Sequence, residues 1–561
     1  MTRLPVPAGD EILFVPLGGV GDIGMNCALY GHAGRWIMVD LGVMFGDETT
    51  PGIEIIVPDT AAAEAVRDRL DAIVITHAHE DHIGAVPHLW PELGAPVHVT
   101  PFSAAFLRRK LRDERAEGEV PIVEHRPGER FSVGPFELEY LPLAHSIPEP
   151  NALVIRTAAG TVFHTGDWKL DPGPVVGDPV DEGVFRRLGD EGVAAMICDS
   201  TNATIDGASG SEADLLGSLT DLVASKDNRV VFACFASNVA RLDTVARAVA
   251  ANGRSAALVG RSLKRMDEIA RQCGYLADIP AFVSEQHTGY LPRSNAAMIC
   301  TGSQGEPRAA LARIASGSHP HVELESGDTL VFSSRTIPGN ERAVARLQER
   351  FVRMGVEIVT SKDAFVHVSG HPGRDELRRM YGWIRPKSAV PVHGELHHLR
   401  AHARLARECG VGTVAEIEDG VLLRISEDKV ERVGEIPVGR LGLDGGRLVP
   451  LDSEHVRARR RLSEQGFVTG SIVLNGRGKV LAAPRVSSRG IVADDEVQGL
   501  ASELADRGAH ALERLSAKQR RDDDTVEDAV RTAMRRHVRA NYGRRPLVEV
   551  HVMRIDGGQS G

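Results

Sequence analysis

The residues best suited to chemistry in this sequence lie in one short run, residues 76–84, which reads Thr-His-Ala-His-Glu-Asp-His-Ile-Gly. Within six positions this run holds His77, His79, Asp81 and His82. Imidazole nitrogens combined with carboxylate oxygens suit zinc, manganese or iron(II). A single histidine would more often be a surface residue or a hydrogen-bonded core residue, but the density of this run predicts a metal site.

The segment before the run is expected to hold it in place. Residues 71–75, Asp-Ala-Ile-Val-Ile, form a short apolar stretch that is typical of a buried strand. The candidate ligands would therefore lie on the loop that leaves this strand.

A glycine run near the start, residues 19–24, fits the pattern G-x-G-x-x-G and follows a strand-like stretch at 12–17. A dinucleotide-binding site would need a helix to begin at these glycines. Residues 26–30 and 35–39 instead have the pattern of further short strands. The glycines are therefore predicted to form a tight turn between strands.

The spacing His-x-His-x-Asp-His resembles the signature of the metallo-β-lactamase superfamily. In that fold His77 and His79 would bind one metal, and Asp81 and His82 the other. The resemblance implies three further ligands, each expected where an apolar strand meets a loop, and the candidates are His145, Asp167 and His393. Asp40 matches the first motif of the superfamily and is interpreted as a carboxylate that orients a ligand histidine.

Two metals that share a carboxylate would form a hydrolytic centre, since together they lower the pKa of a shared water and stabilise the attacking and leaving oxygens. The expected cofactor is two zinc ions per subunit, with manganese or magnesium as alternatives. Thioesters, lactams and phosphodiesters are all substrates that such a fold can accept, and the fold alone does not choose among them.

A long segment between Asp167 and His393 alternates strand-like and helical patterns, which predicts an inserted domain with βαβ units. The branch of the superfamily with such an insertion is the β-CASP group, whose members act on nucleic acids. Asp199, His371 and His393 match the motifs of that group.

Within the β-CASP group the sequence resembles the ribonuclease J family over nearly its whole length, including Gly18-Gly19 and residues 44–48. The resemblance implies a ribonuclease that degrades or matures single-stranded RNA, in messenger RNA decay and ribosomal RNA processing. It also implies 5′→3′ exonuclease action that prefers 5′-monophosphate ends, with some endonuclease activity. Since no ligand position departs from the pattern, activity is expected.

The resemblance further places a substrate pocket around residues 367–371. The residues expected to bind substrate are His367, Val368, Ser369, Gly370, His371, Ser237 and Asn238. Imidazole, hydroxyl and amide donors suit a 5′-terminal monophosphate, and a glycine lets the backbone approach it closely. His371, hydrogen-bonded to Asp199, is the candidate donor of a proton to the leaving 3′ oxygen, although the roles of this pair could be exchanged.

The expected architecture is an α/β protein, a metallo-β-lactamase αββα sandwich with an inserted Rossmann-like β-CASP domain and a small C-terminal α+β domain. The first part of the sandwich would comprise residues 1–203, the β-CASP domain 204–360 and the second part of the sandwich 361–445. A linker is predicted at 446–462. The C-terminal domain, 463–561, is assigned to assembly because it supports dimers and tetramers in the family.

Composition is that of an ordinary globular protein, with 42% hydrophobic and 25% charged residues among 561. The net charge of −11 argues against an indiscriminate nucleic-acid binder but leaves room for a locally basic groove. No apolar run could span a bilayer and no signal peptide opens the sequence, so no membrane partner is expected. The six cysteines lack C-x-x-C spacing and are interpreted as reduced residues of a cytoplasmic protein.

Two alternatives stay open at this point. One is a β-CASP endoribonuclease that cuts RNA internally, and the other is a non-catalytic RNA-binding subunit of a decay complex. A thioester or lactam hydrolase is less favoured because the insertion would then lack a purpose. The expected partners are single-stranded RNA and further copies of the chain in a homodimer or homotetramer, with an RNA helicase or other decay-complex proteins as candidates.

Overall fold

The computed structural model describes residues 4–116 and 118–555. They form two compact units: one contains residues up to 44 together with 57–439, and the other contains 45–56 together with the chain from 440 onward. None of the helices in the described ranges combines the length and the apolar character that crossing a membrane requires.

Two large sheets form the centre of the first unit. The order of the eight-stranded sheet is β24 (Val430–Glu435), β23 (Val421–Ile425), β1 (Ile12–Gly18), β3 (Cys27–His32), β4 (Arg35–Val39), β7 (Leu70–Val74), β8 (Val97–Val99) and β9 (Ile122–Glu124). The order of the seven-stranded sheet is β10 (Arg130–Val133), β11 (Phe136–Pro142), β12 (Asn151–Thr157), β13 (Gly160–His164), β14 (Ala195–Asp199), β20 (Ser388–Val392) and β22 (Thr413–Val414).

Side-chain alternation along the strands creates two cores. On β12, Leu153 and Ile155 pack into the apolar core between the two sheets, whereas Ala152 and Val154 face the opposite way, as the period of two in a strand requires. The second core is closed by α5 (Glu182–Glu191), α11 (Arg374–Ile384) and α12 (Leu396–Glu408).

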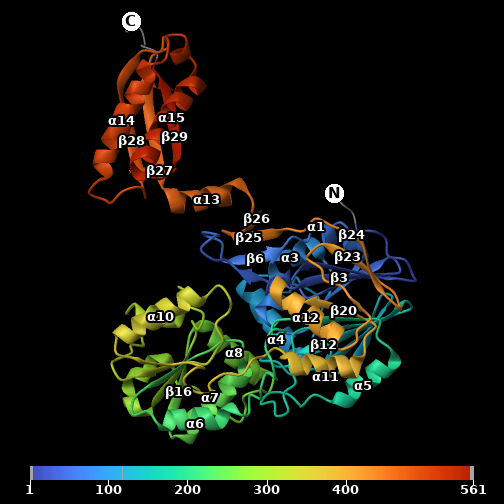
Figure 1. The fold of residues 1–561 in the computed structure, drawn as a ribbon. Helices are drawn as coiled ribbons and strands as arrows, with labels where there is room; N and C mark the ends of the chain where they lie inside the picture. Colours follow the sequence, from blue (N-terminus) through green and yellow to red (C-terminus); the bar gives the residue numbers. More distant parts are fainter. Residues whose placement is uncertain (1–3, 117, 556–561) are drawn as a thin grey trace. The chain divides into compact units, whose positions relative to one another are not determined.

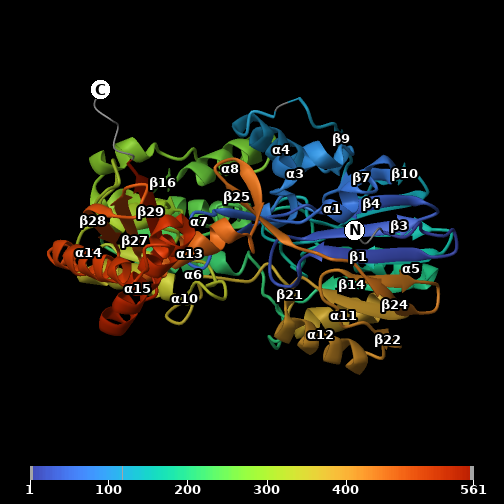
Figure 2. The same ribbon diagram turned by 90° about the horizontal axis from the view of Figure 1, so that it is seen from above.

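The helices complete a layered sandwich. In Figure 2, α11 and α12 lie on one side of the strands, and α3 (Val86–Leu93) and α4 (Pro101–Asp113) lie on the other. The predicted αββα sandwich is therefore confirmed.

Residues between β14 and β20 form the expected inserted domain, seen in green and yellow in Figure 1. Its parallel sheet has the order β16 (Ser255–Val259), β17 (Ala296–Cys300), β15 (Val230–Ala233), β18 (Thr329–Phe332) and β19 (Glu357–Val359). One face is covered by α6 (Leu215–Ala224), α7 (Val239–Ala251) and α8 (Arg261–Gln272). The other face is covered by α9 (Ala310–Ala315) and α10 (Glu341–Arg353).

The chain leaves β15 towards one side of this sheet and leaves β18 towards the other, since β16 and β17 lie on one side of β15 while β19 lies beyond β18. In open α/β sheets, ligands bind in the crevice at the carboxyl ends of strands where the direction reverses in this way. The ends of β15 and β18 are therefore the place to look for a ligand in the inserted domain.

A buried ion pair ties the inserted domain together at these strand ends. Arg241 of α7 has a fully buried side chain, and its Nε and Nη2 donate to the Glu212 carboxylate at 2.6 and 3.0 Å. The third nitrogen, Nη1, donates to the carbonyl and the hydroxyl oxygen of Ser333 at 2.6 and 2.7 Å. The guanidinium thus joins segments that are distant in the sequence.

Replacing Glu212 with alanine is expected to lower the free energy of unfolding by about 3–5 kcal/mol, because Arg241 would be left buried without its counter-charge. Denaturant unfolding measures the effect, with the exposed Arg346→Ala of α10 as control. Replacing both partners together, Glu212→Leu with Arg241→Met, should destabilise less than Glu212→Ala alone. A loss below about 1 kcal/mol for Glu212→Ala would contradict the expectation.

The C-terminal part contains the elements that its sequence pattern predicted: β27 (Phe467–Leu474), β28 (Val480–Arg489), α14 (Val497–Glu513), α15 (Asp523–Tyr542) and β29 (Leu547–Arg554). Its sheet has the order β28-β27-β29, with β27 parallel to β29. Figure 1 shows α14 and α15 alongside this sheet, and their apolar faces share one core with it.

The residues predicted as a linker, 446–462, have regular structure. They contain β26 (Arg447–Pro450) and the first part of α13 (Glu454–Gln465). β26 pairs with β25 (Arg440–Asp444) through a tight turn in which Gly445 and Gly446 have φ values of 54° and 83°. The two glycines, interpreted from the sequence as a break, are the turn of a hairpin, where positive φ favours glycine. The compact units accordingly divide after 439 rather than 445.

Candidate metal centre

The candidate ligands meet at one edge of the two sheets because the strands that carry them run in parallel pairs. β4 pairs with β7, β13 with β14, and β14 with β20, all parallel. The residues at or just beyond the ends of these strands or of β11 are Asp40, His77, His79, His145, Asp167, Asp199 and His393. Asp81 and His82 follow on the short helix α2 (Glu80–Ile83).

Four of these residues form a first group of potential ligands. One ligand atom from each of His77, His79, His145 and Asp167 lies within 4.8 Å of the others. His77 Nε2 and His145 Nε2 approach His79 Nδ1 to 3.1 and 3.0 Å.

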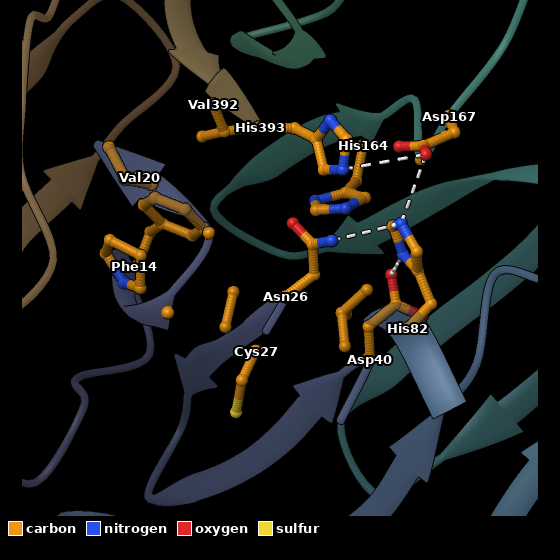
Figure 3. A pocket seen from close by; sticks show the side chains of 16 residues that line it. Phe14, Val20, Asn26, Cys27, Asp40, His82, His164, Asp167, Val392 and His393 are labelled. Carbon is orange, nitrogen blue, oxygen red and sulfur yellow. Dashed lines mark hydrogen bonds and ion pairs between the residues drawn. The ribbon is translucent and has the colours of Figure 1, made fainter. Parts of the chain in front are cut away.

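A second group consists of Asp81, His82, Asp167 and His393. Asp167 belongs to both groups: its Oδ2 lies 3.3 Å from His82 Nε2 and 3.6 Å from His393 Nε2, and 3.9 Å from His77 Nε2. Figure 3 shows Asp167, His82 and His393 turned towards one another. The structure thus brings together all seven residues that the resemblance assigned to two metals.

These groups fit metal cations better than a hydrogen-bonded cluster. Three imidazole nitrogens 3.0–3.1 Å apart approximate an edge of a zinc tetrahedron, which is about 3.3 Å for zinc–nitrogen bonds of ~2.05 Å. Asp167 Oδ1 is buried and has no hydrogen-bond partner in the described part of the chain, and such atoms commonly await an ion. Because most of the donors are nitrogen, they suit zinc more than magnesium, which prefers oxygen ligands.

The protonation states also suit cation binding. Burial lowers the pKa of His79 to about 4 and holds the pKa values of His77 and His145 well below their usual range. Burial alone would raise the pKa of the Asp167 carboxyl, but His393 and His82 hold it well below its usual range. Neutral imidazoles and an ionised carboxylate are the forms that bind metal.

The second group is supported from behind by Asp40, which has a positive φ of 62°. Its carboxylate accepts hydrogen bonds from the Thr76 amide at 2.8 Å and from His82 Nδ1 at 2.7 Å. This contact leaves Nε2 of His82 free to face the other ligands, as Figure 3 shows. Carboxylate partners of this kind fix the ring orientation and the tautomer of a ligand histidine.

Replacing Asp40 with asparagine is expected to lower zinc affinity and activity roughly 10- to 100-fold, because the ring of His82 loses its charged acceptor. Zinc affinity is measured by competition with a chelator of known affinity, and activity with RNA. The exposed Asp221→Asn of α6 serves as control. Unchanged zinc affinity in Asp40→Asn would show that Asp40 does not orient His82.

Two side chains near the ligands escaped sequence reasoning. Asn26 Nδ2 donates to the Asp81 carbonyl at 3.0 Å and lies 3.1 Å from His82 Nε2. Thr201 Oγ1 donates to Asp199 Oδ1 at 2.7 Å and accepts from His393 Nδ1 at 2.7 Å. Thr201 stands within the motif that marked Asp199, whereas no local pattern marks Asn26.

The glycine run that imitates a dinucleotide motif contributes to this centre. No helix begins at residues 19–24, all of which are described, so the predicted tight turn is confirmed. Val20–Gly21 (β2) pairs with Gly394–Glu395 (β21), and the Gly19 carbonyl accepts from the His393 amide at 2.8 Å. Gly42 is equally constrained, because a Cβ there would lie 1.7 Å from the Asp81 carbonyl oxygen.

The predicted acid–base pair lies beside the second group. His371 Nδ1 donates to Asp199 Oδ2 at 2.9 Å. Burial disfavours the protonated ring, yet the Asp199 carboxylate raises the pKa of His371 above its ordinary value. One residue earlier, the Gly370 carbonyl accepts from His145 Nδ1 at 2.5 Å. The 367–371 stretch is therefore attached directly to a candidate ligand.

The other residues predicted to bind substrate surround the ends of β15 and β18. His367 Nδ1 lies 3.4 Å from Arg241 Nη1, which leaves Nε2 as the donor nitrogen. Asn238 Oδ1 accepts from the Arg241 amide at 2.8 Å at the start of α7, directly after Ser237. Val368 is only 6% exposed and packs into the apolar core, so only its backbone could reach a ligand.

The fold and the paired ligand groups define a class, the metal-dependent hydrolases of the metallo-β-lactamase superfamily. A family model described as "Metallo-beta-lactamase superfamily" matches residues 20–233. One described as "Zn-dependent metallo-hydrolase RNA specificity domain" matches residues 355–415. A solved structure of a protein of unknown function from Enterococcus faecalis V583 has a TM-score of 0.52 at 15% identity, covering 74% of this chain and all of that one; it shows the fold alone.

Two further models narrow the class. "Ribonuclease J, beta-CASP domain" matches residues 227–351, and "Ribonuclease J C-terminal domain" matches residues 454–555. The chain is 44% identical to Ribonuclease J of Sinorhizobium meliloti, covering 97% of this chain and 98% of that relative. It is 38% identical to Ribonuclease J of Mycobacterium tuberculosis H37Rv (96% of each chain) and 31% identical to Ribonuclease J2 of Bacillus subtilis (97% and 99%). The chain belongs to the ribonuclease J family and is a zinc-dependent metallohydrolase.

Proposed function

We propose that this protein removes nucleotides one at a time from the 5′ end of single-stranded RNA, prefers ends with a monophosphate, and cuts internally to a lesser extent. The observation that carries the proposal is the short stretch His367–His371. At one end it lies against the ligand crevice of the inserted sheet, through Arg241 and His367. At the other end it contacts His145 and Asp199 of the metal centre. A phosphate pocket and a hydrolytic centre joined by five residues suit stepwise trimming.

The donors of this pocket suit a terminal phosphate. Ser369 Oγ accepts from Asn202 Nδ2 at 2.7 Å and from the His371 amide at 3.2 Å, so its own hydrogen is free to be donated. Asn238 uses its carbonyl oxygen to cap α7, which leaves its amide hydrogens for a ligand. The start of α7 also adds the positive end of a helix dipole.

Two zinc ions held by the two ligand groups would supply a water of lowered pKa and positive charge opposite the reacting phosphate. Asp167 would hold both ions, and Asp40 and Thr201 would keep His82 and His393 in position. His371 would give a proton from Nε2 to the leaving 3′ oxygen, while Asp199 holds its Nδ1. The products would be a nucleoside 5′-monophosphate and a shortened RNA with a new 5′-monophosphate.

The decisive experiment compares a 3′-labelled RNA carrying a 5′-monophosphate with its 5′-triphosphate twin, using His77→Ala as the inactive control. The proposal expects mononucleotides from the monophosphate substrate at a rate at least about tenfold higher than from the triphosphate. Equal internal cutting of both substrates would favour the endonuclease instead. No cleavage by zinc-loaded protein would favour an RNA-binding subunit.

We also propose that the C-terminal domain mediates assembly. Its sheet buries one face against α14 and α15, and Met553 of β29, 47% exposed, pairs with Val473 away from that core. Light scattering of the full chain and of Met553→Lys tests this, since a dimer or tetramer should dissociate in the variant. The predicted helicase partner, the cytoplasmic location and the domain limits stay predictions.

A further inference from the structure

Arg335 occupies the crevice at which the inserted sheet reverses direction. It follows β18 by three residues, across from the β15 end that leads to Ser237 and Asn238. Ser333, two residues earlier, donates from Oγ to the carbonyl of Val366 at 2.7 Å. Arg335 therefore stands on the strand end that contacts the start of the 367–371 stretch.

The guanidinium of Arg335 is held in place by a single side chain of the same pocket. Arg335 Nη1 donates to Asn202 Oδ1 at 2.6 Å. The amide nitrogen of Asn202 in turn donates to Ser369 Oγ at 2.7 Å and to the carbonyl of His371 at 3.0 Å. One asparagine thus aligns the arginine with the residues proposed to bind the terminal phosphate.

Most of the binding capacity of this guanidinium is unused. Arg335 is exposed, and no carboxylate forms an ion pair with it among residues 4–116 and 118–555, whereas the neighbouring Arg241 is fully paired with Glu212. Of its five N–H donors, one is used by Asn202. Its backbone is also fixed, since its carbonyl accepts from Gln304 Nε2 at 2.9 Å.

The charge of Arg335 acts on the pocket in the absence of substrate. Burial, together with the guanidinium groups of Arg241 and Arg335, lowers the pKa of His367 to about 3. A cation close enough to disfavour a second positive charge on His367 would attract the negative charge of a phosphate bound at the same place.

We infer that Arg335 binds the 5′-terminal phosphate of the RNA and is a determinant of the preference for monophosphate ends. This inference rests on the proposed function and adds to it the cation that the pocket uses. A planar guanidinium can donate two parallel hydrogen bonds to phosphate oxygens, which a lysine ammonium cannot match. The uncharged donors of Ser369, Asn238 and His367 would then surround the same group.

The test compares RNA with a 5′-monophosphate and the same RNA with a 5′-hydroxyl. Arg335→Ala should lower kcat/KM for the monophosphate substrate roughly 10- to 100-fold, the usual effect of losing a charged hydrogen bond, and leave the hydroxyl substrate unchanged. Arg335→Lys should recover part of the loss. Arg346→Ala, an exposed arginine of α10, is the matched control and should behave as wild type on both substrates.

Equilibrium binding gives a second readout that needs no turnover. In the inactive His77→Ala background, Arg335→Ala should weaken binding of the monophosphate RNA and leave binding of the hydroxyl RNA unchanged. Equal losses for both RNAs, or none, would overturn the assignment of Arg335 while a wild-type preference for monophosphate ends keeps the proposed function. A wild-type enzyme without that preference would overturn both.

Discussion

Replacing Asp167 with asparagine is expected to lower kcat/KM on RNA roughly 1,000-fold or more, since metal ions contribute several kcal/mol of transition-state stabilisation. The reason is its place in both ligand groups. Its Oδ2 lies between 3.3 and 3.9 Å from nitrogens of His77, His82 and His393. An amide of the same size would remove the negative charge that balances two cations.

The measurement pairs RNA cleavage with metal analysis of the purified protein. Wild type stripped with a chelator should regain activity when zinc is added, whereas Asp167→Asn should stay inactive and bind less zinc. Asp190→Asn, at an exposed position paired with Arg385, controls for the loss of one carboxylate. Full zinc content together with wild-type activity in Asp167→Asn would refute a shared ligand.

Replacing His371 with alanine is expected to slow RNA cleavage roughly 100- to 10,000-fold, the usual contribution of a general acid. The leaving 3′ oxygen of RNA is strongly basic and needs a proton as its bond to phosphorus breaks. His371 Nδ1 is held by Asp199 at 2.9 Å, so Nε2 is the nitrogen available to give that proton. Because none of the candidate ligand groups described above depends on His371 alone, the variant should keep its zinc.

A substrate with an activated leaving group separates proton donation from a structural role. A p-nitrophenyl phosphodiester expels a phenolate that needs no proton, so His371→Ala should hydrolyse it at close to the wild-type rate. His287→Ala, an exposed histidine of the inserted domain, should be normal on both substrates. Equal losses on RNA and on the p-nitrophenyl ester would mean that His371 supports the site rather than donating the proton.

The metal centre was accessible from the sequence because its signals are local. His77, His79, Asp81 and His82 lie within one loop, and a buried strand directly before them predicts where that loop is held. His145, Asp167 and His393 were found by resemblance, and the structure places all three at the edge where the four-residue run lies. Parallel pairing explains this, since parallel strands end at the same edge of a sheet.

Other features were hidden because they depend on contacts between distant parts of the chain. Asn26 holds Asp81 across 55 residues of sequence, and Arg335 meets Asn202 across 133. Neither residue lies in a pattern with a helical or strand period, so nothing local distinguishes it from a surface residue. The hairpin at Gly445 and Gly446 was missed because two glycines favour a break and a turn equally.

The sequence by itself determined the layered α/β fold, the insertion and the kind of metal ligands, because apolar periodicity and ligand type are properties of neighbouring residues. Only the tertiary structure decided which ligands form each group and which residues orient them. His145 meets Gly370 across 225 residues, and His393 meets Asp81 across 312. Contacts at such separations arise from the packing of whole sheets and domains, which no local pattern encodes.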